Sequence, residues 1–459
     1  MNSKKNNHAL QKSIIWKQSK KWDQEKYKRV KESIQIRIKK NNEIVYSTSD
    51  GEILRIEKPQ EYLINHFLFN NKDQIKNLLW FCEYRQSNRQ YQKWSATWGG
   101  EVLRGVGGYI NNGLKEGPWK ELIQNYSSQV IVYQIGQYQN DKKKGIWEFM
   151  YKNNKIGSGL YNEQGQKHCK WRELSHDFSD QSQITLNGEY KNGKKIGRWD
   201  ILFKRQIMEL IGGGQYSFEG DGVKNGRWTE INFNFSVDLQ LTYNGEYKNG
   251  KKIGQWDICY RDRRINKFEK IGGGLYLQGG DGQKVGKWIE LSDQFKQHEQ
   301  ISYAGEYNKN GKKVGRWDIW YKDSETKYNE QIGGGCYDQE GQGVKIGSWI
   351  ELCEGFKKSQ LFSKEITYNG EYIKDRKVGR WNIMYREWNK ESFHQIGYGY
   401  YDERGDGIKI GKWMELSYWF YVDRQITYIG EYKNGKKIGT WFEFEIKKNE
   451  IIKEMKYDD

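Results

Sequence analysis

The chain has 459 residues, of which 36% are apolar and 30% charged, and its formal net charge is +17. With a mean hydropathy of −1.02 and no run of about 18 apolar residues, it excludes a broad aliphatic core and a transmembrane helix. The five cysteines lack disulfide or metal spacing, and the first residues, MNSKKNNHAL, lack an apolar signal core. We therefore expect a soluble protein in a reducing, intracellular compartment.

Residues 1–83 are interpreted as a basic N-terminal arm followed by a small cap. Residues 1–40 hold 13 Lys/Arg and three acidic residues, which suits a solvated surface or, alternatively, contact with an anionic surface. The spaced apolar residues within 1–33 predict a helix. After it we expect short strands at Ile34–Ile38, Glu43–Tyr46 and Glu52–Ile56, and short helices at Pro59–Phe69 and Asp73–Phe81. Such a piece can cover the exposed sheet edge of a repeat array.

The stretch 243–258, YNGEYKNGKKIGQWDI, is one copy of a unit that recurs over residues 84–446. Its Asn-Gly pair predicts a two-residue type I′ turn between two antiparallel strands. That turn places Gly245 opposite Gly254 and Tyr243 opposite Trp256. Because side chains alternate across a strand, the Trp and Tyr rings share one face with these glycines, and polar residues take the other.

The same register is predicted in the other copies, with Gly188 opposite Gly197 and Leu186 opposite Trp199 as an example. In one copy a three-residue loop, Lys309–Gly311, keeps Gly305 opposite Gly315. The structural positions of the repeat are Gly188, Tyr190, Gly197, Trp199, Gly245, Tyr247, Gly254, Trp256, Gly305, Tyr307, Gly315, Trp317, Gly370, Tyr372, Gly379, Trp381, Gly430, Tyr432, Gly439 and Trp441.

Two kinds of hairpin alternate along the array, and the structural period is a pair of hairpins. The A type has the sequence above, with a degenerate first copy at Tyr84–Trp94, and the B type follows a glycine cluster and ends in Trp-x-Glu-Leu/Ile. We expect seven A and six B hairpins. Twelve of the 20 tryptophans occupy the repeat's own Trp position, which predicts that the core is a row of aromatic rings.

Each B hairpin ends in a linker of the form Leu/Ile-x-x-x-aromatic, as in Leu291 and Phe295. The i, i+4 spacing predicts one helical turn that folds the aromatic side chain over the sheet.

These units resemble the MORN repeat, especially the variant in which the closing glycine pair reads Gly-x-Trp. The resemblance covers residues 84–446, and residues 447–459 remain as a charged C-terminal tail. It implies an elongated, solenoid-like all-β meander of antiparallel hairpins, which follows the small basic α+β region expected from the N-terminal residues. It also implies a role in scaffolding or cytoskeletal organisation, and in some members contact with anionic lipid. The alternation of A and B hairpins and the aromatic linkers depart from the plain repeat.

The sequence predicts no catalytic residues, no metal site and no cofactor. Glycine clusters such as Gly212–Gly214 lead into another hairpin, whereas a phosphate-binding loop leads into a helix, so we interpret them as close backbone approaches. The glutamates recur at equivalent positions, which favours a cross-strand charge ladder over an active site. The histidines form no ligand pattern.

The feature most open to function is a row of basic residues at the A-hairpin tips, which either contacts an anionic surface or protects the sheet edge and solubility. The candidate contacts are Lys142, Lys143, Lys194, Lys195, Lys251, Lys252, Lys312, Lys313, Arg376, Lys377, Lys436 and Lys437. Nucleic acid is not expected, because the aromatic rings belong to the packed face.

The leading hypothesis is a non-enzymatic scaffold that binds other proteins at a cytoplasmic, cytoskeletal or ciliary location. The alternative is a peripheral membrane protein that binds anionic lipid through the basic N-terminus and the lysine tips. The sequence leaves the partner and the oligomeric state open.

Overall fold

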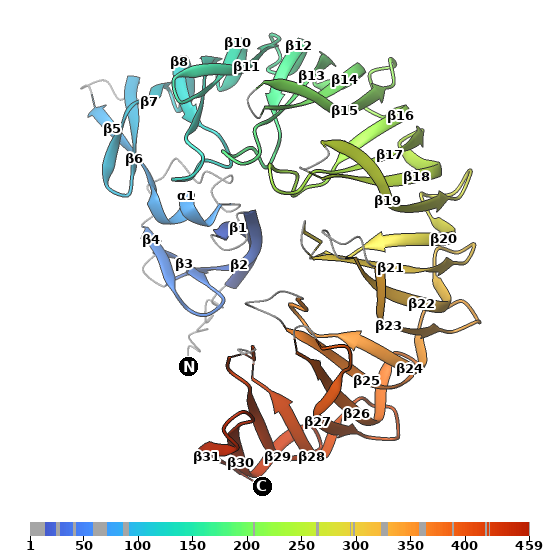
Figure 1. The fold of residues 1–459 in the computed structure, drawn as a ribbon. Coiled ribbons are helices and arrows are strands. Elements are labelled where there is room, and N and C mark those ends of the chain that lie inside the picture. The colour runs from blue at the N-terminus through green and yellow to red at the C-terminus, as the bar shows by residue number, and fades with distance from the viewer. Residues whose placement is uncertain are drawn as a thin grey trace, which may run out of the picture. The chain divides into compact units, whose positions relative to one another are not determined.

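The computed structural model describes residues 14–23, 28–39, 43–57, 71–85, 91–204, 207–262, 266–293, 295–296, 299–322, 329–357, 364–387, 390–417, 420–421 and 423–458. Of these residues, 70% lie in strands and 2% in a helix, which confirms the predicted all-β class. The chain divides into two units, Met1–Val237 and Asp238–Asp459. Each unit contains a meander of antiparallel hairpins (Figure 1).

The first unit begins with a four-stranded antiparallel sheet. It consists of β1 (Ile14–Asp23), β2 (Lys28–Ile38), β3 (Ile44–Thr48) and β4 (Ile53–Glu57) in that order. The helix predicted within residues 1–33 is wrong, because β1 and β2 pair continuously from Ile14 opposite Arg37 to Asp23 opposite Lys28. This long hairpin satisfies the backbone hydrogen bonds of a segment whose apolar periodicity is weak. The predicted strands Glu43–Tyr46 and Glu52–Ile56 are confirmed to within two residues, whereas the predicted strand Ile34–Ile38 is only the last part of β2.

One short helix, α1 (Lys72–Asn77), follows the small sheet. The Asn71 side chain caps it by accepting from the backbone N–H groups of Asp73 and Gln74. The predicted helix Asp73–Phe81 is too long, because the chain is already extended at Leu78 and the residues after it pair in a strand. The predicted helix Pro59–Phe69 lies outside the described residues.

The helix joins the small sheet to the start of the meander. Ile75 is 1% exposed and packs with Ile34, Tyr46 and other residues of the small sheet's core. On its other side, Gln74 Nε2 donates to the carbonyl oxygen of Ile123 at 2.9 Å.

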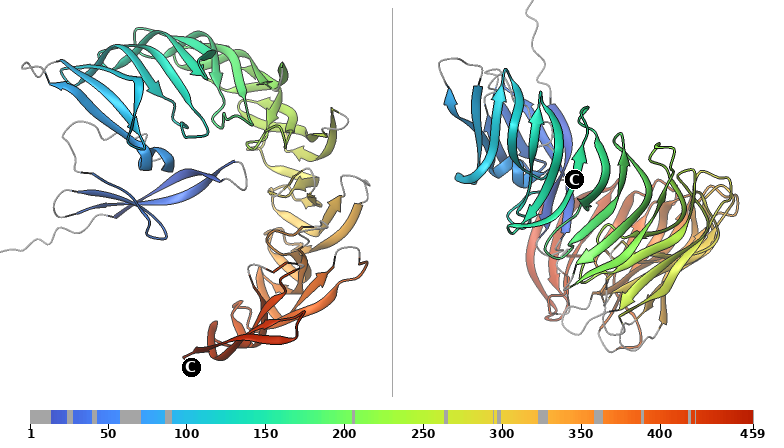
Figure 2. Two further views of the ribbon diagram at one scale, coloured as in Figure 1. Left: turned by 60° about the vertical axis from the view of Figure 1, so that its left-hand side comes forward. Right: turned by 90° about the horizontal axis from the view of Figure 1, so that it is seen from above.

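In the first unit, consecutive strands pair along the meander (Figures 1 and 2). The strands are β5 (Leu78–Arg85), β6 (Tyr91–Trp98), β7 (Glu101–Asn111), β8 (Leu114–Leu122), β9 (Val132–Gln139), β10 (Lys142–Tyr151), β11 (Asn154–Tyr161), β12 (Lys167–Leu174), β13 (Ile184–Lys191), β14 (Lys194–Lys204), β15 (Met208–Tyr216) and β16 (Lys224–Ile231). The degenerate copy at Tyr84–Trp94 is the end of β5 and the start of β6.

The second unit continues in the same way, and Figure 2 shows its hairpins following one another in chain order. The strands are β17 (Leu241–Lys248), β18 (Lys251–Asp262), β19 (Lys267–Tyr276), β20 (Lys284–Leu291), β21 (Gln300–Tyr307), β22 (Lys313–Lys322), β23 (Asn329–Tyr337), β24 (Lys345–Leu352), β25 (Glu365–Ile373), β26 (Arg376–Arg386), β27 (His394–Tyr401), β28 (Lys409–Leu416), β29 (Ile426–Lys433), β30 (Lys436–Glu445) and β31 (Glu450–Tyr457). Most of the predicted tail 447–459 is therefore a strand, and β31 pairs with β30.

The predicted turn at the A-hairpin tip is confirmed, but the predicted glycine pairing is wrong. Near the tip, Lys248 faces Lys251 and Glu246 faces Ile253, as expected. Farther from the tip the register shifts, so that Tyr243 faces Ile258 instead of Trp256. Gly254 has a φ of +62°, which belongs to a bulge in β18.

The same shift occurs in the other A hairpins for which a pairing was predicted. Leu186 faces Ile201 instead of Trp199, Tyr428 faces Glu443 instead of Trp441, and Tyr303 faces Ile319. The Gly188–Gly197, Gly305–Gly315 and Gly430–Gly439 pairings are therefore replaced by the bulge as well.

The bulge adds two residues to one strand, and this number explains why the predicted faces are still correct. Side chains alternate with a period of two, so an insertion of two leaves every later side chain on its original face. Trp256, Ile258 and Tyr260 accordingly lie buried on the face that also carries Tyr247. The shift brings Gly245 under the indole of Trp256, where a Cβ atom would overlap the ring.

The predicted aromatic core is confirmed. All twelve repeat tryptophans are at most 6% exposed. The linker aromatic side chains are also buried, with Phe235 and Phe420 only 1% and 0% exposed. The predicted helical turn is replaced by a tight turn, because the Phe295 N–H donates to the carbonyl of Ser292, three residues back.

Candidate binding groove

The floor of the candidate site in the second unit is a ladder of alternating Trp and Tyr rings. Tyr276 and Trp288 have ring centroids 5.1 Å apart at 84°, and Trp288 and Tyr307 follow at 6.2 Å and 83°. Edge-to-face contacts of this kind place the positive ring edge on the negative face of the neighbour. Apart from that of Trp381, the indole N–H groups of the repeat tryptophans in this unit also donate to backbone carbonyls, as Trp317 does to the Glu306 carbonyl oxygen at 3.2 Å. The ladder therefore fixes the position of every ring.

A carboxylate with two lysines lies beside the ladder at five of the B hairpins. Glu290 accepts hydrogen bonds from the Tyr307 hydroxyl at 2.8 Å and from Lys313 at 3.0 Å, and it also pairs with Lys284. Lys313 Nζ lies 3.8 Å from the centroid of Trp317, and Lys284 Nζ lies 4.6 Å from that of Trp288. Two ammonium groups over two indole faces thus share one carboxylate.

We call this arrangement the Lys-Glu-Lys cluster. Four further glutamates have the same arrangement as Glu290. They are Glu121 with Lys115 and Lys143, Glu173 with Lys167 and Lys195, Glu351 with Lys345 and Lys377, and Glu415 with Lys409 and Lys437. Each cluster carries two positive charges and one negative charge.

Burial and pairing have opposite effects on these groups. Burial would raise the pKa of Glu351, but hydrogen bonds and Coulomb attraction from Lys345 and Lys377 outweigh it and hold that pKa below its usual value. In the first unit, burial lowers the pKa of Lys143 to about 8 against the attraction of Glu121. Burial also raises the pKa of Tyr337 to about 12, so the ladder tyrosines are neutral near pH 7.

The structure divides the predicted basic tips into inner and outer residues. The inner ones lie over repeat tryptophans, with Nζ 3.8 to 3.9 Å from the ring centroid, and are Lys143, Lys195, Lys252, Lys313, Lys377 and Lys437. The outer ones are exposed and are Lys142, Lys194, Lys251, Lys312, Arg376 and Lys436. Two outer residues pair with an aspartate of the next loop, Lys251 with Asp281 and Arg376 with Asp406. The tips are therefore not a uniform row of solvated charges.

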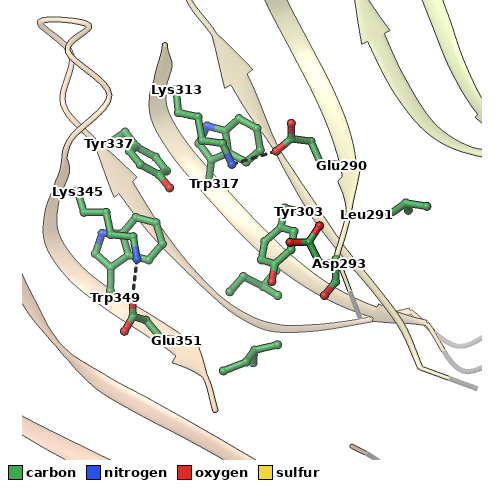
Figure 3. Close-up of a pocket in the computed structure, with 13 residues that line it drawn as sticks. Glu290, Leu291, Asp293, Tyr303, Lys313, Trp317, Tyr337, Lys345, Trp349 and Glu351 are labelled. Carbon is green, nitrogen blue, oxygen red and sulfur yellow. Dashed lines mark hydrogen bonds and ion pairs between the residues drawn. The ribbon is translucent and has the colours of Figure 1, made fainter. Parts of the chain in front are cut away.

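A pocket of about 570 Å³ opens on the ladder between β20 and β24. Its polar lining includes Glu290 with Lys313 and Glu351 with Lys345, and Figure 3 shows Lys313 and Lys345 lying over Trp317 and Trp349. The remaining lining is Tyr303, Ile319, Tyr337, Leu291, Leu352, Ser292 and Asp293. We refer to this amphipathic pocket as the groove.

Sequence reasoning missed the lysines of the B hairpins, although a signal for them exists. Lys284, Trp288 and Glu290 follow the spacing Lys-x-x-x-Trp-x-Glu, and the same spacing recurs in every B hairpin from β8 to β28. The predicted charge ladder is present for these glutamates. The side chains of the A-hairpin glutamates, such as Glu246 and Glu371, are exposed. The backbone carbonyl of Glu246 accepts a hydrogen bond from the Trp256 indole N–H.

The glycine clusters lie where the backbone meets neighbouring rings. A Cβ atom on Gly274 would overlap Trp288, and one on Gly273 would overlap the carbonyl oxygen of Trp256. The chain continues from them into a hairpin, which confirms their interpretation as close approaches. Among the described residues, no three His, Cys, Asp or Glu side chains are placed to hold a metal ion, and no helix is long and apolar enough to cross a membrane.

Comparison with known proteins does not add to this geometry. No family model matches the chain, and no curated protein matches it. Functional inference therefore rests on the groove and the clusters beside it.

Proposed function

We propose that this protein is a non-enzymatic scaffold of MORN-like repeats that binds segments of other proteins in the groove. The observation that carries the proposal is the amphipathic lining of the 570 Å³ pocket. Tyr303, Leu291 and Leu352 line it while only partly buried, and apolar area that remains open beside fixed polar groups is typical of recognition sites.

Repetition supports a binding role over a catalytic one. An active site needs unlike groups that converge at one place, whereas the titratable groups beside the ladder repeat as equal clusters. Each carboxylate is already held by two lysines and a tyrosine hydroxyl, as at Glu351. Such a surface suits contact along a polypeptide.

Binding to anionic lipid through the hairpin tips is the alternative, and it has less support. Half of the basic tip residues are turned over tryptophan rings, and Lys251 and Arg376 of the outer half pair with aspartates. These pairings reduce the charge that a membrane surface would meet.

The test is proximity labelling in the native cell with three versions of the full chain. The groove variant is Leu291→Ser with Leu352→Ser. The matched control is Ile289→Ser with Ile350→Ser, which changes residues on the same two strands that are 43% and 39% exposed and do not line the groove. We expect reproducible protein partners with the wild type and the control, and their loss with the groove variant. The absence of reproducible partners, or their retention by the groove variant, would refute the proposal.

A further inference from the structure

We propose that the groove selects acidic amphipathic polypeptide segments, with carboxylates placed toward Lys313 and Lys345 and apolar side chains against Leu291, Ile319 and Leu352. This inference rests on the proposed function and specifies the chemistry of the partner.

The charge balance of the clusters is the first argument. At the groove, Glu290 and Glu351 are paired with Lys284, Lys313, Lys345 and Lys377, and Asp293 also lines the pocket. Four ammonium groups against these three carboxylates leave a surplus of one positive charge. A surplus that is partly removed from water is stabilised by a further carboxylate.

The accessibility of these lysines is the second argument. The side chains of Lys313 and Lys345 are 27% and 26% exposed and line the pocket. An ammonium group has three N–H donors. A glutamate and an indole face account for two directions at each lysine, and the third can serve a bound carboxylate without breaking the cluster.

The apolar part of the lining requires an apolar component in the ligand. Leu291, Leu352 and Ile319 line the pocket together with the Tyr303 ring. A purely acidic ligand would leave this surface in contact with water, so the ligand must carry apolar residues between or beside its carboxylates.

The lysine spacing limits the ligand pattern. The lysines recur on every second strand, β20, β22, β24 and β26, which corresponds to about 10 Å at roughly 4.8 Å per strand. A helix covers that distance in about seven residues, on one face, at 1.5 Å per residue. An extended chain covers it in about three residues at 3.3 Å each. The ligand should therefore repeat its acidic residues at one of these two intervals.

Nucleic acid fits the groove less well, although it is also anionic. Single-stranded nucleic acid binds through bases stacked on open aromatic faces. Here Lys313 covers a face of Trp317, and Tyr337 packs edge-to-face against the same indole at 6.2 Å. The ladder offers carboxylate-binding ammonium groups but no open stacking platform.

The test is a selection of random 16-residue peptides displayed on phage, with the full chain as the target. We expect enriched peptides that combine apolar residues with a net negative charge. Their affinity, measured by fluorescence anisotropy, should fall at least tenfold when their Glu and Asp are replaced by Gln and Asn, and should weaken with added salt.

Protein variants locate the effect. Lys313→Gln with Lys345→Gln should bring the acidic peptide and its neutral version to similar affinities, while Lys194→Gln with Lys436→Gln at the exposed tips should leave the tenfold difference intact. Melting temperatures identify variants that unfold. If both variants unfold, the affinities of the acidic and neutral peptides for the wild-type protein still test the proposal.

The outcomes separate the two proposals. Enriched neutral or basic peptides that need Leu291 and Leu352 would overturn the acidic selectivity and leave the scaffold function standing. No enrichment would refute both proposals. Binding of a dT16 oligonucleotide more tightly than every enriched peptide would overturn the assignment of a polypeptide ligand.

Discussion

Lys313 lies over Trp317, with Nζ 3.8 Å from the indole centroid. The same lysine reaches Glu290 on a neighbouring hairpin at 3.0 Å. A residue that the sequence places at a hairpin tip is therefore part of the packed face, and it connects the aromatic ladder to the charged wall of the groove.

The ladder predicts the cost of removing one ring. Trp256 is 3% exposed and contacts Tyr247 and Tyr276 edge to face. We expect Trp256→Ala to lower the unfolding free energy by about 3–5 kcal/mol, measured by urea denaturation. Leu210→Ala, at a side chain that is 57% exposed, is the control and should change it by less than about 0.5 kcal/mol. An unchanged denaturation midpoint for Trp256→Ala would contradict the assignment of the buried face.

The bulge predicts different roles for the two glycines of one hairpin. Gly245→Ala should cost about 1–3 kcal/mol by overpacking, because its Cβ would overlap the Trp256 ring. A Cβ atom on Gly254 would meet only the Gln278 side chain, at 3.9 Å, but Gly254 has a φ of +62°, so Gly254→Ala should cost about 1 kcal/mol from backbone strain alone. Near-ultraviolet circular dichroism distinguishes them, since only Gly245→Ala displaces a tryptophan. Equal spectra would favour the glycine pairing that the sequence predicted.

The sequence predicts much of the hairpin and less of its register. The Asn-Gly turn fixes the pairs nearest the tip, but the bulge at Gly254 depends on how the Trp256 ring packs on Gly245, a contact that a two-strand pairing scheme does not contain. The faces were correct because the bulge adds an even number of residues. The helix predicted within residues 1–33 failed because pairing between β1 and β2 outweighs a weak local periodicity.

The candidate site was predictable only in part. The alternation of side chains puts Trp317 on the buried face, yet it does not say that Lys313 folds back over the ring. That position depends on Glu290, which comes from a different hairpin and is distant in sequence. The open space between Leu291 and Leu352 likewise results from the packing of several hairpins.

The division of the tips predicts unequal effects of two adjacent residues. Lys377 lies 3.9 Å from the Trp381 centroid and 2.9 Å from Glu351, so Lys377→Met should cost about 1–3 kcal/mol. Arg376 pairs with Asp406 while 58% exposed, and Arg376→Met should cost less than about 1 kcal/mol. Thermal and urea denaturation measure both. Equal costs would mean that the inner and outer positions are not distinct.

The clusters also predict loss of stability in acid. The folded-state pKa values of Glu290, Glu351 and Glu415 are depressed below the usual 4.5, because attraction from the lysines outweighs burial. Their stabilising contribution is therefore present above that value and is lost as the pH falls through the lower folded-state values. We expect the urea midpoint to decrease steadily below about pH 5.

A variant isolates this contribution to acid sensitivity. Replacing Glu290, Glu351 and Glu415 by Gln should make the decrease below pH 5 shallower, while lowering stability at pH 7. An unchanged slope would assign acid sensitivity to other carboxylates.

The most direct test of the central claim is hydrogen–deuterium exchange of the full chain with and without an enriched peptide. If the groove holds the polypeptide segment, backbone amides should be protected in β20, β22 and β24 around Leu291, Ile319 and Leu352, and this protection should be absent in Leu291→Ser/Leu352→Ser. Protection confined to the A-hairpin tips, with none in these strands, would contradict the claim.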